Sequence, residues 1–199
     1  VPAELLDAAQ AARAQMLEAL AMYSDELMER LLSEEEVPPE LIHTVTRSVV
    51  QQQDVTPVFL GTAYRNKGVQ PLLDAITRYL PSPLERDISA HQVDDPQQTL
   101  PLAPDPEAPF VGMAFKIVDD PYGQLTFVRI YQGRIEKGQM YFNQRTGKRD
   151  RFSRIVRMHA DKREEIDQAE AGDIVAVMGI DCASGDTYAR QPRYCSLES

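Results

Sequence analysis

The chain has 199 residues, of which 43 % are hydrophobic and 26 % are charged, and its formal net charge is −10. This length allows one large or two small domains with their own cores, and the composition is typical of a soluble globular protein. The apolar runs are too short to cross a bilayer and no charged-then-apolar leader opens the chain, so we expect neither a membrane protein nor a secreted one. Cys182 and Cys195 are too few for a disulfide framework and predict reduced thiols in the cytoplasm.

The charge is distributed unevenly along the chain. Residues 1–107 contain 7 Lys or Arg against 18 Asp or Glu, whereas residues 108–199 contain 14 against 13. Residues 145–163 alone contain 8 basic and 2 acidic side chains, a net charge of +6. Such a stretch attracts a partner that carries phosphates, while the acidic first half repels it. A solvated hairpin face is the alternative interpretation of the same residues.

Helical periodicity dominates the first 52 residues. Apolar side chains recur every three or four positions over residues 3–32 and predict one long amphipathic helix. Its apolar face is expected to consist of Leu5, Ala9, Ala12, Met16, Leu20, Tyr23, Leu27 and Leu31. Two prolines then open a second helix over about 40–52, whose inward residues are expected to be Leu41, Ile42, Val45 and Val49.

A strand, a tight turn and a third helix are predicted next. The strand is marked by Val55, Val58 and Phe59, and the helix covers 69–80. The buried side of this helix is expected to carry Leu72, Leu73, Ile76 and Leu80. Prolines at 81 and 83 prevent the helix from continuing.

The period changes from 3.6 to 2 in the second half. Residues 84–109 are rich in Pro, Asp and Gln and predict a linker or a wrapped extended segment. Short strands are then expected from Phe110, over 125–131, and at 139–143, 152–158 and 173–179, with a turn at 119–123. Short strands every dozen residues with glycine turns predict a small antiparallel barrel.

The run from Gly61 to Pro83, GTAYRNKGVQPLLDAITRYLPSP, resembles the elongation factor G family of translational GTPases. Thr62-Ala63-Tyr64 is similar to the Ser-Ala-Leu or Ser-Ala-Phe signature of that family. Further similar segments follow in the family's order: 79–83, 114–117, 120–127, 158–166, 171–174 and 184–187. The resemblance covers about residues 4–187. The chain departs from the common pattern by Thr in place of Ser at 62 and by an Asp-Pro-Tyr turn that is one residue shorter.

The resemblance implies an α+β multidomain fold. Residues 1–83 would be the C-terminal part of a P-loop-type α/β GTPase domain, including the end of its helical insertion. Residues 84–107 would be a Pro-rich linker, and residues 108–199 the antiparallel translation-factor β-barrel of the second domain. The parent protein would bind GTP or GDP with Mg²⁺ and couple GTP hydrolysis on the ribosome to movement of tRNA and mRNA.

Two nucleotide-binding motifs of such a GTPase do not occur in the sequence. It contains no Gly-x-x-x-x-Gly-Lys-Ser/Thr phosphate loop, and Asn66-Lys67 is followed by Val69 where Asn-Lys-x-Asp requires an acid. We therefore expect a fragment that hydrolyses no GTP and binds it weakly. By the resemblance, the backbone N–H of Ala63 would contact the guanine O6 between Thr62 and Tyr64.

The resemblance also implies the partners. The barrel would face the RNA of the small ribosomal subunit, and we expect contacts from Arg149, Arg151, Arg154 and Arg157. Strand alternation is expected to bring Arg149, Arg151, Ser153 and Arg157 to one side. The first helix would face the ribosomal stalk protein, and the protein is expected to be a monomer. Two alternatives stay open: a free-standing RNA- or ribosome-binding module, and a ribosome-protection or recycling GTPase. The three histidines offer neither a catalytic pair nor a metal-ligand spacing.

Overall fold

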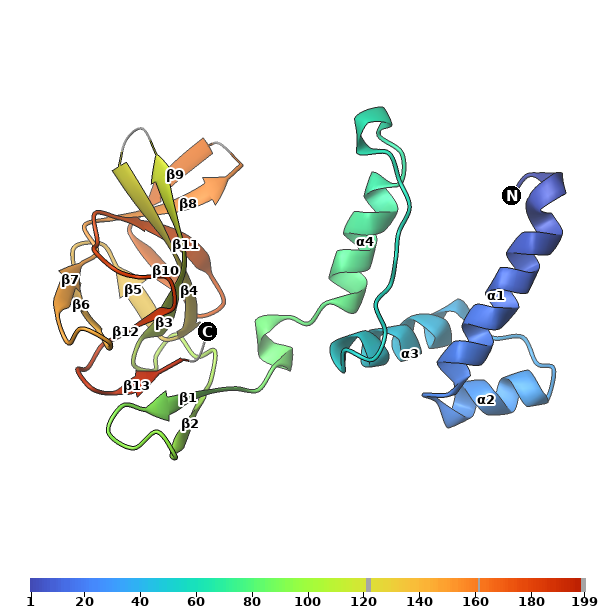
Figure 1. Ribbon diagram of the computed structural model, residues 1–199, viewed down its shortest axis with the longest axis horizontal. Helices are drawn as coiled ribbons and strands as arrows, with labels where there is room; N and C mark the ends of the chain where they lie inside the picture. Colours follow the sequence, from blue (N-terminus) through green and yellow to red (C-terminus); the bar gives the residue numbers. More distant parts are fainter. Residues whose placement is uncertain (121–122, 161, 198–199) are drawn as a thin grey trace. The chain divides into compact units, whose positions relative to one another are not determined.

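The computed structural model describes residues 1–120, 123–160 and 162–197, and the chain forms two units, Val1–Ser82 and Pro83–Ser199 (Figure 1). The first unit is helical and the second consists mainly of strands. Among the described residues, no helix has the length and apolar character needed to cross a membrane. The cysteines at 182 and 195 are both free.

The first unit contains four α-helices: α1 Leu6–Ala21, α2 Asp25–Leu32, α3 Pro39–Gln51 and α4 Val69–Tyr79. Two short 3₁₀ helices, Ala3–Leu5 and Ala63–Arg65, precede α1 and α4. The prediction of a single helix over 3–32 is wrong, because the chain turns between Ala21 and Asp25. Ser24 has an extended backbone, and its hydroxyl accepts a hydrogen bond from the Leu27 N–H at 3.3 Å, which caps a new helix.

The core of the first unit lies between α1, α2 and α3. It consists of Leu17, Leu20, Ala21, Leu27, Val37, Ile42, Val45 and Val49. The expected inward face of the second helix is confirmed at Ile42, Val45 and Val49. The expected face of the first helix is only partly correct, because Leu20 and Leu27 are buried whereas Leu5, Met16 and Tyr23 are exposed.

Residues 55–60 and one face of α4 lack the packing that their apolar sequences predict. No strand is present at 55–60, because no described segment pairs with it. Leu72, Leu73, Ile76 and Leu80 were expected to be buried, but they are 45–56 % exposed. The residues of α4 that pack inward are Ala75 and Tyr79. The apolar stripe of α4 is therefore real, but nothing in the described part of the first unit covers it.

The second unit is built around an eight-stranded antiparallel sheet with the order β7-β6-β12-β3-β4-β11-β8-β9 (Figure 1). Its strands are β3 Val111–Asp120, β4 Gly123–Gln132, β6 Met140–Asn143, β7 Arg149–Arg151, β8 Arg154–His159, β9 Lys162–Ile166, β11 Ile174–Met178 and β12 Asp186–Ala189. A small second sheet pairs β5 Arg134–Glu136 with β10 Gln168–Glu170. The sheet curls, which confirms the expected translation-factor barrel. The turn predicted at 119–123 includes Pro121 and Tyr122, which lie outside the described residues.

The Pro-rich segment 84–107 is extended and carries strands. A 3₁₀ turn, Pro83–Glu85, leads into β1 Ile88–Gln92, which pairs with β2 Thr99–Leu102 and with β13 Cys195–Ser196. Ala90, Leu102 and Cys195 are buried together with Val111 and Ala189. Burial raises the pKa of the Cys195 thiol to about 11. The segment is thus packed on the second unit as a wrapped extended piece.

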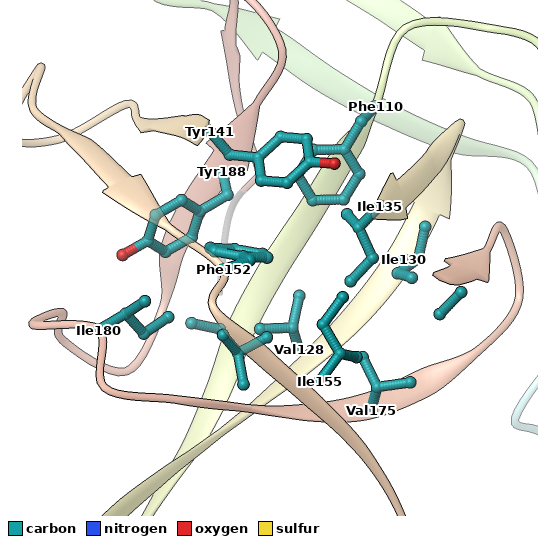
Figure 2. Close-up of a cluster of buried hydrophobic side chains, with 13 residues drawn as sticks. Phe110, Val128, Ile130, Ile135, Tyr141, Phe152, Ile155, Val175, Ile180 and Tyr188 are labelled. Carbon is teal, nitrogen blue, oxygen red and sulfur yellow. The ribbon is translucent and has the colours of Figure 1, made fainter. Parts of the chain in front are cut away.

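The barrel core is aromatic at one end and aliphatic at the other (Figure 2). Tyr141 packs against Phe110 and against Phe152 with ring centroids 4.8 Å apart in each case, and Phe152 meets Tyr188 edge-on at 5.3 Å. Such tilted and edge-to-face pairs add to the stabilisation from area burial alone. Tyr188 lies on β12 and Tyr141 on β6, so this cluster fixes these two neighbouring strands.

Candidate functional site

The first candidate site is the loop that joins residues 55–60 to α4. Thr62 and Lys67 pair through their backbones, with the Thr62 N–H 2.9 Å from the Lys67 carbonyl and the Lys67 N–H 3.1 Å from the Thr62 carbonyl. Between them Ala63–Arg65 forms one 3₁₀ turn, and Asn66 closes it in the left-handed region at φ 50°. The loop is therefore fixed by its own backbone.

Two glycines make this closure possible. Gly61 and Gly68 lie face to face, and a methyl group on Gly61 would stand 2.8 Å from the Lys67 carbonyl oxygen. A methyl group on Gly68 would stand 2.7 Å from the Leu60 carbonyl oxygen, and Gly68 also has a φ of +76°. Only glycine tolerates both the left-handed backbone and this close approach.

The loop exposes the three residues predicted to lie beside the base. Thr62, Ala63 and Tyr64 are all exposed, Tyr64 completely. The Ala63 N–H makes no hydrogen bond with any described residue, as is usual for the first N–H group of a helical turn. The Thr62 side chain makes no capping hydrogen bond. The arrangement therefore leaves a backbone donor open to an acceptor on a ligand.

The second candidate site is the basic stretch 145–163, and the structure divides it. Phe152 is fully buried, and its N–H and carbonyl bond to residues 139 and 138, so the chain leaves the edge strand β7 there. Within the described part of the chain β7 pairs with β6 alone, whereas β8 lies between β11 and β9. The prediction that one strand alternation aligns Arg149, Arg151 and Arg157 is therefore wrong, since the strands differ.

The arginines on β8 have acidic partners. Arg154 Nε donates to Glu165 Oε1 at 3.0 Å, and Arg157 Nη2 lies 3.7 Å from Asp173 Oδ2. Arg154 and then Lys137 hold the pKa of the Glu165 carboxyl below its usual range. These pairs are exposed or half-exposed, so they contribute little to stability and still compete with an external anion.

The arginines on β7 are differently placed. Arg149 lies over the Phe142 ring at 5.6 Å, and Arg151 Nε donates to the Gly138 carbonyl at 3.0 Å. Both side chains are exposed, and neither forms an ion pair with a residue that the structure describes. Arg149 and Arg151 are therefore the better placed of the four predicted arginines for a phosphate partner.

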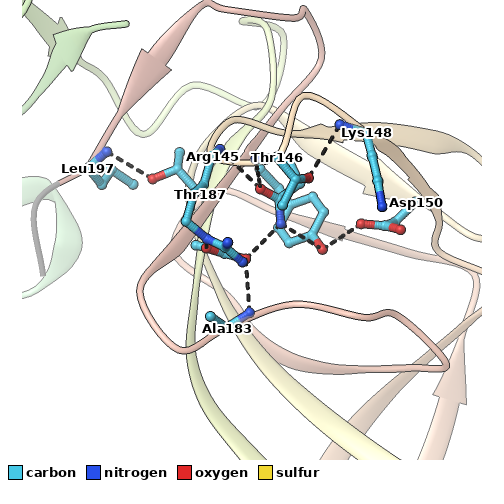
Figure 3. Close-up of polar contacts among 10 residues, drawn as sticks. Arg145, Thr146, Lys148, Asp150, Ala183, Thr187 and Leu197 are labelled. Carbon is cyan, nitrogen blue, oxygen red and sulfur yellow. Dashed lines mark hydrogen bonds and ion pairs between the residues drawn. The ribbon is translucent and has the colours of Figure 1, made fainter.

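A buried polar network lies behind β7 (Figure 3). Asp186 is 3 % exposed, and its Oδ2 accepts from Asn143 Nδ2 at 2.7 Å, from the Ala183 N–H at 2.9 Å and from Arg145 Nη2 at 2.9 Å. Tyr188, which is fully buried, donates from its hydroxyl to Asp150 Oδ2 at 2.7 Å. The sequence analysis missed this network. Asn143 lies in a predicted strand, but no strand was predicted at 186–189, so no signal in the sequence indicated that these residues meet.

Burial sets the protonation states in this network. Burial and the hydrogen bond to Asp150 raise the pKa of Tyr188, so the phenol stays protonated and acts as a donor. Burial opposes ionisation of Asp186, but Arg145, the Ala183 N–H and Asn143 together hold its pKa below the usual range. Asp186 is therefore the charged acceptor to which the neighbouring donors point.

The sequence of the chain is similar to those of known proteins. Residues 123–189 match the family model "Elongation factor Tu domain 2". Elongation factor G of Rhodopirellula baltica is 61 % identical over 199 residues, which is all of this chain and 28 % of the relative. Elongation factor G 1 of Borreliella burgdorferi is 48 % identical over 188 residues, 94 % of this chain and 27 % of the relative.

Over its whole length the chain is similar to part of elongation factor G. A crystal structure from Thermus thermophilus has the same fold with a TM-score of 0.68 at 27 % identity, covering 96 % of this chain and 26 % of that one. The chain thus spans between a quarter and a third of the length of these elongation factor G relatives.

Proposed function

We propose that this chain contributes a guanine-contacting loop and a ribosome-docking barrel to an elongation factor G. The observation that carries the proposal is the closed loop 61–68, which leaves the Ala63 N–H free to donate to a ligand. All 199 residues of this chain align with elongation factor G of Rhodopirellula baltica at 61 % identity. The parent protein would hydrolyse GTP and couple this reaction to movement of tRNA and mRNA on the ribosome.

The domain boundaries implied by the resemblance form part of the proposal. Residues 1–83 would end a GTPase domain, and residues 108–199 would form the second domain. Residues 84–107 would link these two domains along the chain. Two open apolar hollows of about 450 and 480 Å³ flank residues 55–59, and the α4 stripe is exposed beside one of them. Uncovered apolar surface of this kind supports packing against further elements of a larger domain.

The chain's own residues fit only the base end of a guanine nucleotide. Ala63 would donate its N–H to the guanine O6, with Thr62 and Tyr64 on either side of it. The sequence offers no phosphate loop, and the described residues include no group of three or more His, Cys, Asp and Glu able to hold a metal. GTP or GDP and Mg²⁺ would therefore be held mainly by other parts of the parent protein, which would also supply the phosphoryl-transfer chemistry.

The partners follow from the charge of each unit. RNA of the small ribosomal subunit would meet Arg149 and Arg151, and Arg154 and Arg157 would reach phosphates in competition with Glu165 and Asp173. The exposed acidic side chains Glu18, Asp25 and Glu29 of α1 and α2 would face the stalk protein. A cytoplasmic, monomeric protein is consistent with these roles.

The substitution Ala63→Pro in the full-length factor tests the guanine contact. Ala63 is the first residue of a 3₁₀ turn and Thr62 before it is extended, so proline removes the N–H without opposing the backbone. We expect the affinity for GDP to fall about tenfold, because a hydrogen bond of about 1.4 kcal/mol is lost. Arg65→Ala in the same turn is the control and should bind as the parent does. Unchanged GDP affinity in Ala63→Pro would refute the contact.

A further inference from the structure

The edge strand β7 consists of two arginines with an acid between them. Arg149 and Arg151 are exposed, while Asp150 is half-buried and accepts from the Tyr188 hydroxyl at 2.7 Å. Successive side chains of a strand point to opposite faces. An inward Asp150 therefore requires both arginines to point outward, about 7 Å apart along the strand.

The C-terminal end of β7 is held by the fully buried Phe152, whose backbone bonds to residues 138 and 139. β7 itself is three residues long and, among the strands that the structure describes, pairs with β6 alone, through Phe142 opposite Arg149 and Met140 opposite Arg151. A slip by one residue would turn both arginines to the inner face and Asp150 to the outside. Short edge strands are the part of a sheet where such slips meet least resistance, because only one neighbour holds them.

Tyr188 itself is held firmly. Its ring is fully buried and lies edge-on to Phe152, and its hydroxyl is 3.5 Å from Asn143 Nδ2. Asn143 is also fully buried, and it donates to Asp186 at 2.7 Å. The bonds thus form a chain from Asp186 through Asn143 and Tyr188 to Asp150.

The turn that leads into β7 is fixed by the same residues. Asn143 Oδ1 accepts from the N–H groups of Arg145 and Thr146, both at 3.0 Å, and Arg145 Nε reaches Asp186 Oδ1 at 2.5 Å. The turn therefore cannot shift without breaking hydrogen bonds at a buried carboxylate, which is costly in free energy.

We propose that Tyr188 and Asp150 are positioning residues for RNA docking: their hydrogen bond sets the register of β7 and so presents Arg149 and Arg151 together to phosphates. This inference rests on the proposed docking role of the barrel. Tyr188 and Asp150 touch no RNA themselves and act through the two arginines.

The test measures binding of the full-length factor to isolated small ribosomal subunits as a function of salt. Tyr188→Phe keeps the buried ring and removes the hydroxyl. We expect its slope of log affinity against log salt to become shallower by about 0.7–0.9 for each phosphate that is no longer neutralised, approaching the slope of the Arg149→Ala/Arg151→Ala double variant. Tyr141→Phe is the matched control: Tyr141 lies opposite Asp150 on β6, and this variant loses the hydrogen bond that the Tyr141 hydroxyl accepts from the Glu136 N–H at 2.8 Å but keeps the bond between Tyr188 and Asp150.

A second pair of variants separates the hydrogen bond from the charge of Asp150. Asp150→Asn and Asp150→Ala both remove the charge, but only asparagine keeps an oxygen that can accept from Tyr188. We expect Asp150→Asn to retain the parent slope and Asp150→Ala to lose it. Amide hydrogen exchange at Arg149 and Arg151 should rise in Asp150→Ala and Tyr188→Phe and stay unchanged in Tyr141→Phe.

The outcomes distinguish the two proposals. If the double arginine variant binds with the parent slope, the docking role fails and the positioning role fails with it. If the double variant is shallower but Tyr188→Phe and Asp150→Ala keep the parent slope, docking stands and positioning is wrong. If Asp150→Asn and Asp150→Ala behave alike, the hydrogen bond does not set the register, and the inference is overturned.

Discussion

Replacing Gly68 by alanine adds a methyl group to the point at which the loop 61–68 closes. The new Cβ would lie 2.7 Å from the Leu60 carbonyl oxygen and 2.9 Å from the Gly61 Cα, and both of these are backbone atoms that cannot rotate away. The left-handed φ of +76° adds about 1–2 kcal/mol for a residue with a side chain. Relieving the overlap adds about 1–3 kcal/mol, as for other overpacked sites. We expect Gly68→Ala to lower the free energy of unfolding of the first unit by about 2–5 kcal/mol.

Circular dichroism at 222 nm is a suitable assay, because the four α-helices all lie in the first unit. Urea unfolding of the parent and of each variant gives the change in unfolding free energy. Gly147→Ala is the matched control, since Gly147 has a φ of +70° but no atom within 4 Å of an added methyl group. Gly147 lies in the second unit, so unfolding of this variant is followed by the strand signal. The substitution should lower the free energy of unfolding by only about 1–2 kcal/mol. Equal costs for Gly68→Ala and Gly147→Ala would refute the argument from close approach.

Two further predictions concern the cores of the units. Leu27→Ala should lower the unfolding free energy of the first unit by about 2–5 kcal/mol, because Leu27 is fully buried, whereas Leu32→Ala, 78 % exposed, should change it by less than about 0.5 kcal/mol. Asp186 has a lowered pKa in the folded state, so its contribution is complete above its usual pKa of about 3.9 and disappears as the pH falls through the lowered value. Asp186→Asn should therefore flatten the loss of second-unit stability below about pH 4. A parent-like pH profile in that variant would contradict the assignment.

The second unit followed its sequence pattern closely. Short runs between glycine turns predicted β3, β4, β6, β8 and β11, and alternating burial is clear in β4 and β6, whereas four of the five residues of β11 are buried. The pattern missed β7, β9 and β12. β7 has only three residues and all are charged, β9 is mostly charged, and β12 has all four residues buried, so none of these strands shows an alternation of apolar and polar residues in its sequence.

The first unit departed from its pattern for two different physical reasons. The α1–α2 break is local, since the apolar period runs on through a serine that caps a new helix, and periodicity alone does not detect a cap. The exposure of the apolar stripe of α4 has a cause that is not local. Its sequence correctly signals a surface to be covered, but the covering partner is not among the described residues, so the burial prediction failed where the helix prediction succeeded.

The candidate sites show the same division between local and long-range information. The tight turn at 61–68 is present as predicted, and its closure depends on Gly61, Gly68 and Asn66, which lie within eight residues of one another. Its contact with guanine stays a prediction. The basic stretch 145–163 was predicted to present one face, but the structure divides its arginines between β7 and β8. Strand alternation assumes an unbroken strand, and the buried Phe152 ends β7 after Arg151. Residues 150 and 188 meet across 38 positions of sequence, a distance that no local pattern reports.

An acid inside a basic stretch is explained by this long-range contact. A leucine at position 150 could also point inward, and it would raise the positive charge of β7. It could not accept a hydrogen bond, however, and the fully buried Tyr188 hydroxyl would lose its 2.7 Å acceptor at a cost of about 1–3 kcal/mol. Apolar contact is also non-directional, whereas a hydrogen bond between two fixed atoms specifies one register. A short edge strand that must keep two arginines outward therefore gains more from Asp150 than it loses in net charge.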